Sequence, residues 1–246
     1  TIDREFLATS YTIAQEQGND ITILGEYFCK RSPHISALPT CAQFLKLEFL
    51  QKYPDIRFPE GIQPCEDGLF SHRLLALTQH IGENHQAIYH YRSHENQNHL
   101  KINESCESVL CQIPKWRIIL EDFYDKYHLQ KKKSFHLAHF IEHEPFGLRY
   151  LGMPLNMEQK SLLHGIIKSW MEPILLNLSK QEIKMLSKPF VYFVLSSSAV
   201  DFDRFFKRYQ RRRRLTKRMY LFLIKFIFLK KTRRKLRIKV TEKMKK

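Results

Sequence analysis

Two acidic side chains at the start of a predicted helix are the residues of this chain best suited to acid–base chemistry. Glu66 and Asp67 follow Cys65 and a loop that contains prolines, and an apolar-periodic stretch begins at Phe70. The free N–H groups and the positive end of the helix dipole favour an ionised carboxylate there. Such a carboxylate can act as a general base that activates a hydroxyl group. Simple helix capping is the alternative role for the same residues.

The segment Tyr89–His94, which reads YHYRSH, is a second candidate site. On an extended strand alternate side chains share a face, so His90 and Arg92 lie on one face and the two tyrosines lie on the other. A guanidinium beside an imidazole suits a phosphate or a pyrophosphate, with His94 as a further neighbour. A half-buried strand with one hydrated face is the alternative.

The sequence lacks the motifs of a metal site and of several enzyme classes. Five histidines between residues 80 and 99 follow no familiar ligand spacing. The five cysteines are odd in number and include no CxxC pair, which predicts free thiols in a reducing compartment. The glycine-rich nucleotide-binding loops, the zinc-protease HExxH motif and the GxSxG motif of serine hydrolases are absent from the sequence.

The elements that must position these residues follow from apolar periodicity and turn residues. In chain order the pattern predicts a helix over 4–17, a strand over 21–27, a loop over 30–39, a helix over 41–53, a loop over 54–64, a helix over 66–80 and a strand over 87–92. After about residue 100 the pattern is mainly helical, with a capping box at Ser179 and Glu182. Val191–Leu195 fits either a strand or a helix.

The charge is concentrated at the C-terminal end. The 246 residues carry a net charge of +16, of which residues 204–246 hold +19 and the remainder −3. The longest apolar run, Met219–Leu229, lies between two basic blocks and is too short for a bilayer span, which needs about 20 residues. We therefore expect three parts: residues 1–100, a mainly helical region over 101–203, and a basic amphipathic tail over 204–246.

The tail favours the surface of an anionic membrane. Basic groups near such a surface contribute about 1 kcal/mol each, and the apolar run adds a second attachment signal. Nucleic acid is the less favoured partner, because an RNA-binding arm would leave the rings of Phe222, Phe226 and Phe228 exposed to water. A solvated basic helix without a partner is the third alternative.

The order of the motifs resembles the second half of bacterial family 2 glycosyltransferases, which have the GT-A fold. The resemblance covers roughly residues 1–100. It depends on the strand over 21–27, the loop Phe58-Pro59-Glu60-Gly61, the stretch Glu66-Asp67-Gly68-Leu69-Phe70, and the segment Tyr89-His90-Tyr91-Arg92. The resemblance implies an α/β chain, the C-terminal part of a GT-A fold, followed by the helical region and the tail.

The same resemblance implies roles for individual residues. Asp67 would be the base that deprotonates the acceptor hydroxyl, and Glu66 would be its partner near the acceptor. Arg92 would lie near the diphosphate or the acceptor, with His90 or His94 as a neighbour. The family also uses Mn²⁺ or Mg²⁺, held by a DxD motif that we expect upstream of Thr1.

These inferences give an expected function for the longer protein. It would transfer a sugar, with inversion, from a nucleotide-sugar donor to a hydroxyl of a cell-surface glycan or a lipid-linked acceptor. This chain alone would be inactive, because the metal-binding acids would lie outside it. We expect a cytoplasmic protein, peripheral on the inner face of the cell membrane. The alternative is a non-catalytic protein that docks on membrane or RNA through its basic tail.

Overall fold

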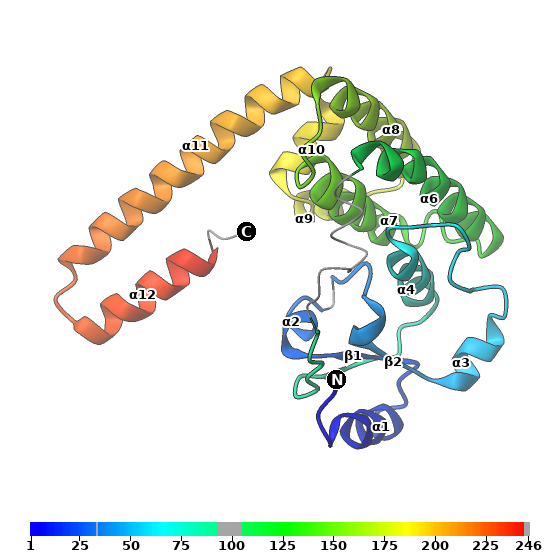
Figure 1. Ribbon diagram of the computed structural model, residues 1–246. Helices are drawn as coiled ribbons and strands as arrows, with labels where there is room; N and C mark the ends of the chain where they lie inside the picture. The colour runs from blue at the N-terminus through cyan, green and yellow to red at the C-terminus, as the bar shows by residue number, and fades with distance from the viewer. Residues whose placement is uncertain (33, 93–104, 244–246) are drawn as a thin grey trace. The chain divides into compact units, whose positions relative to one another are not determined.

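A computed structural model describes residues 1–32, 34–92 and 105–243 (Figure 1). The chain divides into two compact units, Thr1–Val194 and Leu195–Lys246. The first unit combines a small sheet with helices, so the expected α/β class with a helical region is confirmed at that level. The finer division at residues 100 and 203 stays a prediction.

The sheet has three strands in the order β2-β1-β3. The central strand, β1 (Ile21–Leu24), pairs antiparallel with β2 (Gln43–Leu45) and parallel with β3 (Ile81–Asn84). All four residues of β1 are buried, as expected for a strand covered on both faces. Figure 1 shows α1 (Phe6–Glu16) and α4 (Glu66–Leu77) on opposite faces of the sheet.

Helices α1 and α4 confirm the predictions over 4–17 and 66–80, whereas the strand predicted over 21–27 is too long. Strand β1 ends at Leu24 because Gly25 turns the chain with a φ of 89° and is followed at once by α2 (Glu26–Cys29). A side chain at Gly25 would also press on the Ala87 carbonyl, since a Cβ built there lies 3.3 Å from that oxygen.

The helix predicted over 41–53 is also wrong at its start. A 3₁₀ turn, η1 (Thr40–Ala42), leads into β2, and helix α3 occupies only Leu47–Lys52. The hydrogen bonds that β2 makes with the edge of β1 override the helical pattern of this segment.

The strand predicted over 87–92 is absent, because the pairing takes place earlier in the chain. Residues 81–84 form β3 beside β1, and Tyr89 makes only an isolated bridge to Ile2. The two tyrosines do lie on the same side of the chain, as the pattern predicts, because the ring centroids of Tyr89 and Tyr91 are 6.3 Å apart.

Helix α4 is almost entirely buried and joins the sheet to the helical layer. Its buried polar side chains reach neighbouring segments: the Ser71 hydroxyl bonds both the N–H and the carbonyl of Leu38, each at 2.8 Å. Arg73 donates to the Arg57 carbonyl at 2.6 Å. His72 donates from Nδ1 to the Ser36 carbonyl at 2.7 Å, and its Nε2 lies 3.1 Å from the Tyr124 hydroxyl.

The mainly helical pattern expected after residue 100 is confirmed. The capping box at Ser179 and Glu182 is present, and Val191–Leu195 lies in a helix. Trp116, Trp170 and Phe193 are among the fully buried side chains of this layer. Its elements are α6 (Cys106–Lys126), α7 (Ser134–Ile141), the π-helix η2 (Glu142–Tyr150), α8 (Met157–Leu175), α9 (Lys180–Met185) and α10 (Lys188–Leu195).

The second unit is a helical hairpin. Helix α11 (Ala199–Leu223) continues into a 3₁₀ turn, η3 (Ile224–Phe226), and α12 (Lys230–Lys243) turns back beside it (Figure 1). The apolar run of the tail therefore spans the end of α11 and the connection to α12. Among the described residues, no helix combines the length and the apolar character that crossing a bilayer requires.

We expect the first unit to lose stability in mild acid. His72 stacks on His136 with centroids 4.2 Å apart, and burial lowers the pKa of His72 well below its ordinary value and that of His136 to about 4. The unfolded chain takes up these protons below pH ~6.5, whereas the folded chain does not until about pH 4. Stability is therefore complete above that window and falls through it, by up to about 1.4 kcal/mol per pH unit for each histidine.

Denaturant unfolding at several pH values, followed by the fluorescence of Trp116 and Trp170, measures this slope. His136→Gln should make the slope shallower, whereas His80→Gln, at an exposed histidine, serves as the control. Equal slopes in the wild type and His136→Gln would contradict the prediction.

Candidate functional site

Asp67 lies at the start of α4, close to where the sequence placed it, and its pKa is raised. The preceding Cys65 has a left-handed φ of 83°, and α4 begins directly after it. Burial raises the pKa of Asp67, and the charges of Glu66 and Glu144 add to the rise, although hydrogen bonds from the Gly68 N–H (2.8 Å) and the Thr40 backbone lower it. The backbone N–H groups at the helix start favour the ionised form of Asp67, as expected, but the loss of solvation outweighs them and the pKa rises.

A buried ion cluster on the π-helix η2 faces this helix start. Glu144 is 8% exposed and lies 3.3 Å from Nη2 of Arg149 and 3.2 Å from Nδ1 of His143. Burial alone would raise the pKa of Glu144, but His143, Arg149 and a hydrogen bond from the Cys65 thiol together hold it below its ordinary value. Glu144 thus remains a charged neighbour of Asp67. Sequence reasoning missed it, since nothing in the local pattern at 142–150 marks a π-helix.

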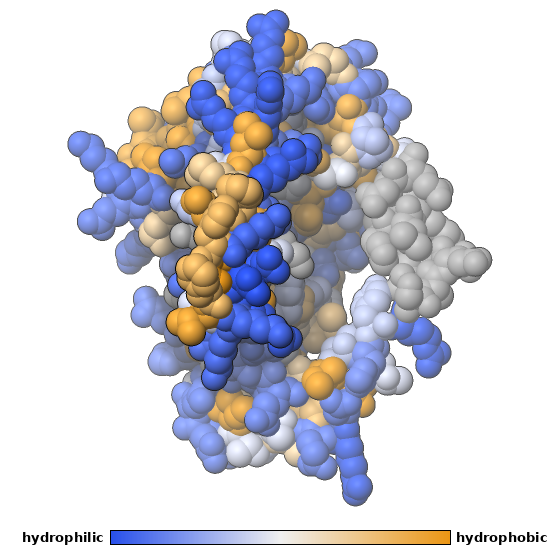
Figure 2. Space-filling model, turned by 90° about the vertical axis from the view of Figure 1, so that its left-hand side faces the viewer, coloured by the Kyte–Doolittle hydropathy of each residue, from blue (hydrophilic) through white to orange (hydrophobic). Residues whose placement is uncertain are grey.

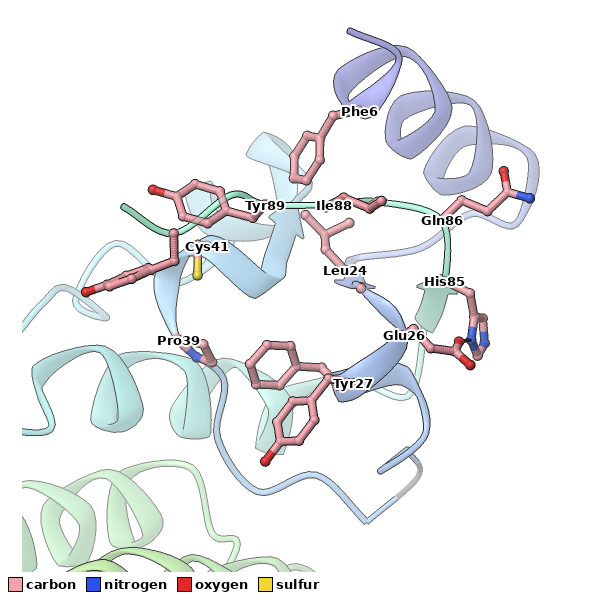
Figure 3. Close-up of a pocket in the computed structure, with 14 residues that line it drawn as sticks. Phe6, Leu24, Glu26, Tyr27, Pro39, Cys41, His85, Gln86, Ile88 and Tyr89 are labelled. Atoms are coloured by element: carbon pink, nitrogen blue, oxygen red, sulfur yellow. Dashed lines mark hydrogen bonds and ion pairs between the residues drawn. The ribbon is translucent and has the colours of Figure 1, made fainter. Parts of the chain in front are cut away.

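A cavity of about 570 Å³ opens at the carboxyl ends of the parallel strands β1 and β3 (Figure 3). This edge of a parallel sheet is the usual place for a ligand, and the volume suits a small molecule. Most of the lining is apolar or aromatic. The lining side chains include Phe6, Leu24, Glu26, Tyr27, Phe28, Pro39, Cys41, His85, Gln86, Ile88, Tyr89 and Tyr91.

Asp67 lies beside one side of this cavity, where Cys41 lines it. Glu26 and His85 lie together at one side, and Cys41 and Tyr89 lie at the opposite side (Figure 3). Burial is the main cause that raises the pKa of the Cys41 thiol, and the charge of Asp67 contributes. The Thr40 backbone bonds Asp67 directly. Asp67 therefore lies next to the segment Thr40–Cys41, and Cys41 of this segment lines the cavity.

The structure does not bring His90 and Arg92 into the lining of the cavity. His90 is exposed, and its Nε2 lies 2.6 Å from Oδ1 of Asp3. The Thr1 carbonyl also accepts from the His90 N–H at 2.7 Å. Arg92 is exposed as well, and His94 lies outside the described residues. The cavity is instead lined by Tyr89 and Tyr91, so the phosphate-binding roles of His90, Arg92 and His94 stay predictions.

A cluster around His85 was also missed by the sequence. Glu26 Oε2 lies 2.6 Å from Nδ1 of His85, and Glu83 Oε2 lies 2.8 Å from Nε2. The hydrogen bonds that the ring donates to these two carboxylates raise the pKa of His85. The alternation of Glu83 and His85 was the available signal, but it gains meaning only from the parallel pairing of β3.

The described residues do not fit the Mn²⁺ or Mg²⁺ that the resemblance implies. Within residues 1–32, 34–92 and 105–243, one group of three ligand side chains is close enough to hold an ion: Cys29, Glu83 and His85. Mg²⁺ takes oxygen ligands, and thiolate and imidazole donors suit other metals better. The Mn²⁺ or Mg²⁺ site expected upstream of Thr1 stays a prediction.

Comparisons with protein-family models, with curated proteins and with solved structures found no match.

We predict that Asp67→Asn lowers the pKa of the Cys41 thiol, because the substitution removes a nearby negative charge that opposes the thiolate. The pH dependence of iodoacetamide alkylation, mapped to Cys41 by peptide mass spectrometry, measures this shift. Glu60→Gln, in an exposed loop, should leave the profile of Cys41 unchanged. An unchanged profile in Asp67→Asn would mean that Asp67 does not lie against this wall of the cavity.

Proposed function

We propose that this chain forms the acceptor side of an inverting glycosyltransferase, with Asp67 as the base. One observation carries the proposal: a carboxylate with a raised pKa lies next to Cys41, which lines an aromatic cavity at the carboxyl ends of parallel strands. A raised pKa makes a carboxylate a stronger proton acceptor, provided that it is ionised at the working pH. The GT-A fold is part of this proposal.

Asp67 acts on a hydroxyl of the acceptor. As the oxygen attacks the anomeric carbon of the donor sugar, its proton passes to the Asp67 carboxylate, and the bond to the leaving nucleoside diphosphate breaks. Because Asp67 is half-buried, the hydroxyl must approach beside Thr40 and Cys41. Glu66 is half-buried and directly precedes Asp67. Its negative charge raises the pKa of Asp67 and so makes that carboxylate a stronger base.

The aromatic lining supports a glycan acceptor. Tyr27, Phe28, Tyr89 and Tyr91 present ring faces and edges to the cavity, and Glu26, His85 and Gln86 supply polar groups among them. Such a mixture suits a sugar ring, which has apolar C–H faces and hydroxyl edges. The acceptor is therefore a glycan or a glycan-bearing lipid, and the donor is a nucleotide-sugar.

The helical hairpin supports binding to an anionic membrane. Its connecting segment exposes large apolar side chains, with Phe226 65% and Phe228 101% exposed, between basic helices. Figure 2 shows apolar side chains gathered beside hydrophilic ones on the face turned toward the viewer. Basic groups attract the headgroups while apolar rings enter the interface. The hairpin thus brings the transferase to the inner membrane surface, where lipid-linked acceptors are made.

The same hairpin supports the alternative function, a non-catalytic protein that docks on membrane or RNA. The exposed rings favour the membrane over RNA, since phosphate contacts would leave them in water. The cavity and Asp67 have no role in this alternative.

In the full-length protein, Asp67→Asn should lower turnover by about 10²–10⁴-fold, the usual contribution of a general base. Folding should change little, because the amide keeps the size and the acceptor oxygen of the side chain. Release of nucleoside diphosphate from a panel of nucleotide-sugars, with membrane extract as acceptor, measures the rate. Asp55→Asn, an exposed carboxylate paired with Lys126, is the matched control. Normal turnover in Asp67→Asn would remove this residue from the mechanism.

Replacing Phe226 and Phe228 together by serine should weaken binding to anionic vesicles even at high salt. Full burial of one phenylalanine contributes about 1.5–3 kcal/mol, so the vesicle partition should fall at least about tenfold. Co-sedimentation at low and high salt measures this, and Leu176→Ser, at an exposed leucine of the first unit, is the control. Complete release of the wild type by salt, with a preference for RNA, would favour nucleic-acid docking instead.

A further inference from the structure

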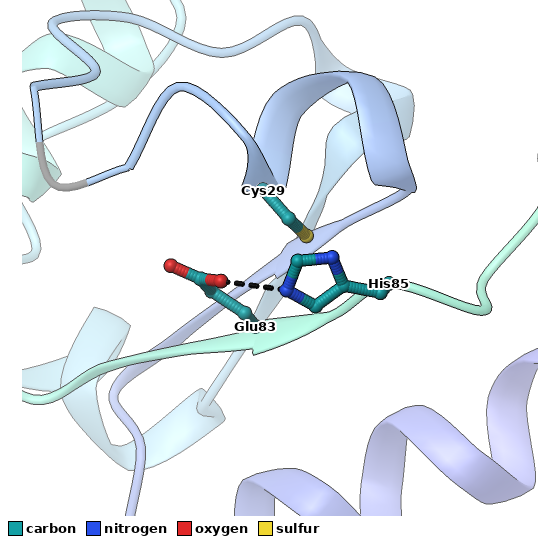
Figure 4. A group of neighbouring side chains, drawn as sticks. All are labelled: Cys29, Glu83 and His85. Atoms are coloured by element: carbon teal, nitrogen blue, oxygen red, sulfur yellow. Dashed lines mark hydrogen bonds and ion pairs between the residues drawn. The ribbon is translucent and has the colours of Figure 1, made fainter. Parts of the chain in front are cut away.

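Three side chains with metal-binding atoms converge beside the cavity (Figure 4). Cys29 comes from α2, Glu83 from β3, and His85 directly follows β3. One ligand atom from each lies within 4.8 Å of the others. Cys29 is buried, with 2% of its surface exposed, whereas Glu83 and His85 are open to solvent on one side. The cluster is therefore anchored in the fold and can be reached by an ion.

A second layer already holds the imidazole in the orientation that a metal ligand needs. His85 donates from Nδ1 to Oε2 of Glu26 at 2.6 Å, and Oε1 of Glu26 is held by Lys30 at 2.6 Å. Histidine ligands in proteins commonly donate their second ring N–H to a carboxylate in this way, which fixes the ring and its tautomer. The other nitrogen, Nε2, faces Glu83 at 2.8 Å. Nδ1 of His85 is therefore held by the Glu26 carboxylate, and Nε2 faces Glu83, the second proposed ligand.

We propose that Cys29, Glu83 and His85 bind a zinc ion through one sulfur, one oxygen and one nitrogen. This donor set matches zinc, which takes thiolate, imidazole and carboxylate together, and it does not match Mg²⁺ or Mn²⁺. Tetrahedral zinc with bonds of about 2.0–2.3 Å needs ligand atoms about 3.3–3.6 Å apart. The three ligand atoms lie within 4.8 Å of one another, and Nε2 of His85 lies 2.8 Å from Oε2 of Glu83, so this pair opens slightly when the ion enters.

Binding exchanges protons for the ion. The Cys29 thiol releases its proton, the His85 ring binds through its unprotonated Nε2, and the Glu83 carboxylate binds as it is.

The ion keeps one coordination position for a water molecule or a ligand. Three protein ligands are typical of zinc sites that retain an open position, whereas structural sites usually have four. His85 and Glu26 also line the cavity, so the ion lies at its edge. The site shares His85 and Glu26 with the lining of the proposed acceptor cavity, and both residues lie on the side opposite Cys41 (Figure 3).

Zinc content and cobalt spectroscopy of the purified full chain test the site without any assay of activity. We expect one Zn²⁺ per chain after dialysis against a zinc buffer, and no displacement by excess Mg²⁺ or Mn²⁺. Co²⁺ in place of zinc should give a thiolate-to-metal charge-transfer band that Cys29→Ser abolishes. Glu26→Gln should keep this band but weaken zinc binding by about 10–100-fold, the usual effect of losing an outer hydrogen bond to a ligand histidine.

Two controls separate a metal site from general effects. Cys111→Ser removes an exposed thiol on α6, and His90→Gln removes an exposed histidine that pairs with Asp3; neither should change zinc affinity or the cobalt band. Because Cys29 is buried, circular dichroism must show that Cys29→Ser is folded, and Glu26→Gln provides a surface variant that does not carry this risk. Absence of stoichiometric zinc, or zinc binding and a cobalt band that survive Cys29→Ser, would overturn the proposal.

Discussion

The first unit depends on one constraint: helix α4 is buried along nearly its whole length although three consecutive residues on it are polar. Ser71, His72 and Arg73 could not be buried without partners, since an unsatisfied buried polar group costs about 1–3 kcal/mol. Their hydrogen bonds therefore fix the segments around Leu38 and Arg57 and attach α4 to α6. The position of Asp67, at the first turn of the same helix, follows from these bonds, because α4 cannot shift without breaking them.

The cavity depends on another buried polar residue, Asn84, at the end of β3. Its buried amide donates to the hydroxyls of Ser10 at 3.1 Å and Thr9 at 3.2 Å, which attaches α1 to the sheet. The amide oxygen accepts from the N–H groups of Gln86 and Ala87, which turns the chain at the mouth of the cavity. One side chain thus sets both the packing of α1 and the path of the loop that carries His85.

The sequence predicted those features that depend on local pattern. The start of α4 at Glu66 follows from proline, acid and apolar spacing, and the helical layer follows from its periodicity. The strands β2 and β3 were missed, because their short segments carry no alternation and become strands only through hydrogen bonds to β1. The cluster of Cys29, Glu83 and His85 was missed for the same reason, since its members meet only after residues 29 and 83 are brought together by the parallel pairing.

The π-helix η2 constrains the number of residues in its segment, because a π-helix and an α-helix of the same sequence place their side chains differently. Arg149 reaches Glu144 five positions earlier, although residues five apart on an α-helix point about 140° away from each other. The wider winding of a π-helix removes this offset. A deletion of one residue between 142 and 150 would restore ordinary winding and turn Arg149 away from both Glu144 and the ring of Trp116, which it now covers at 5.6 Å. Related chains should therefore tolerate substitutions within this segment far better than insertions or deletions.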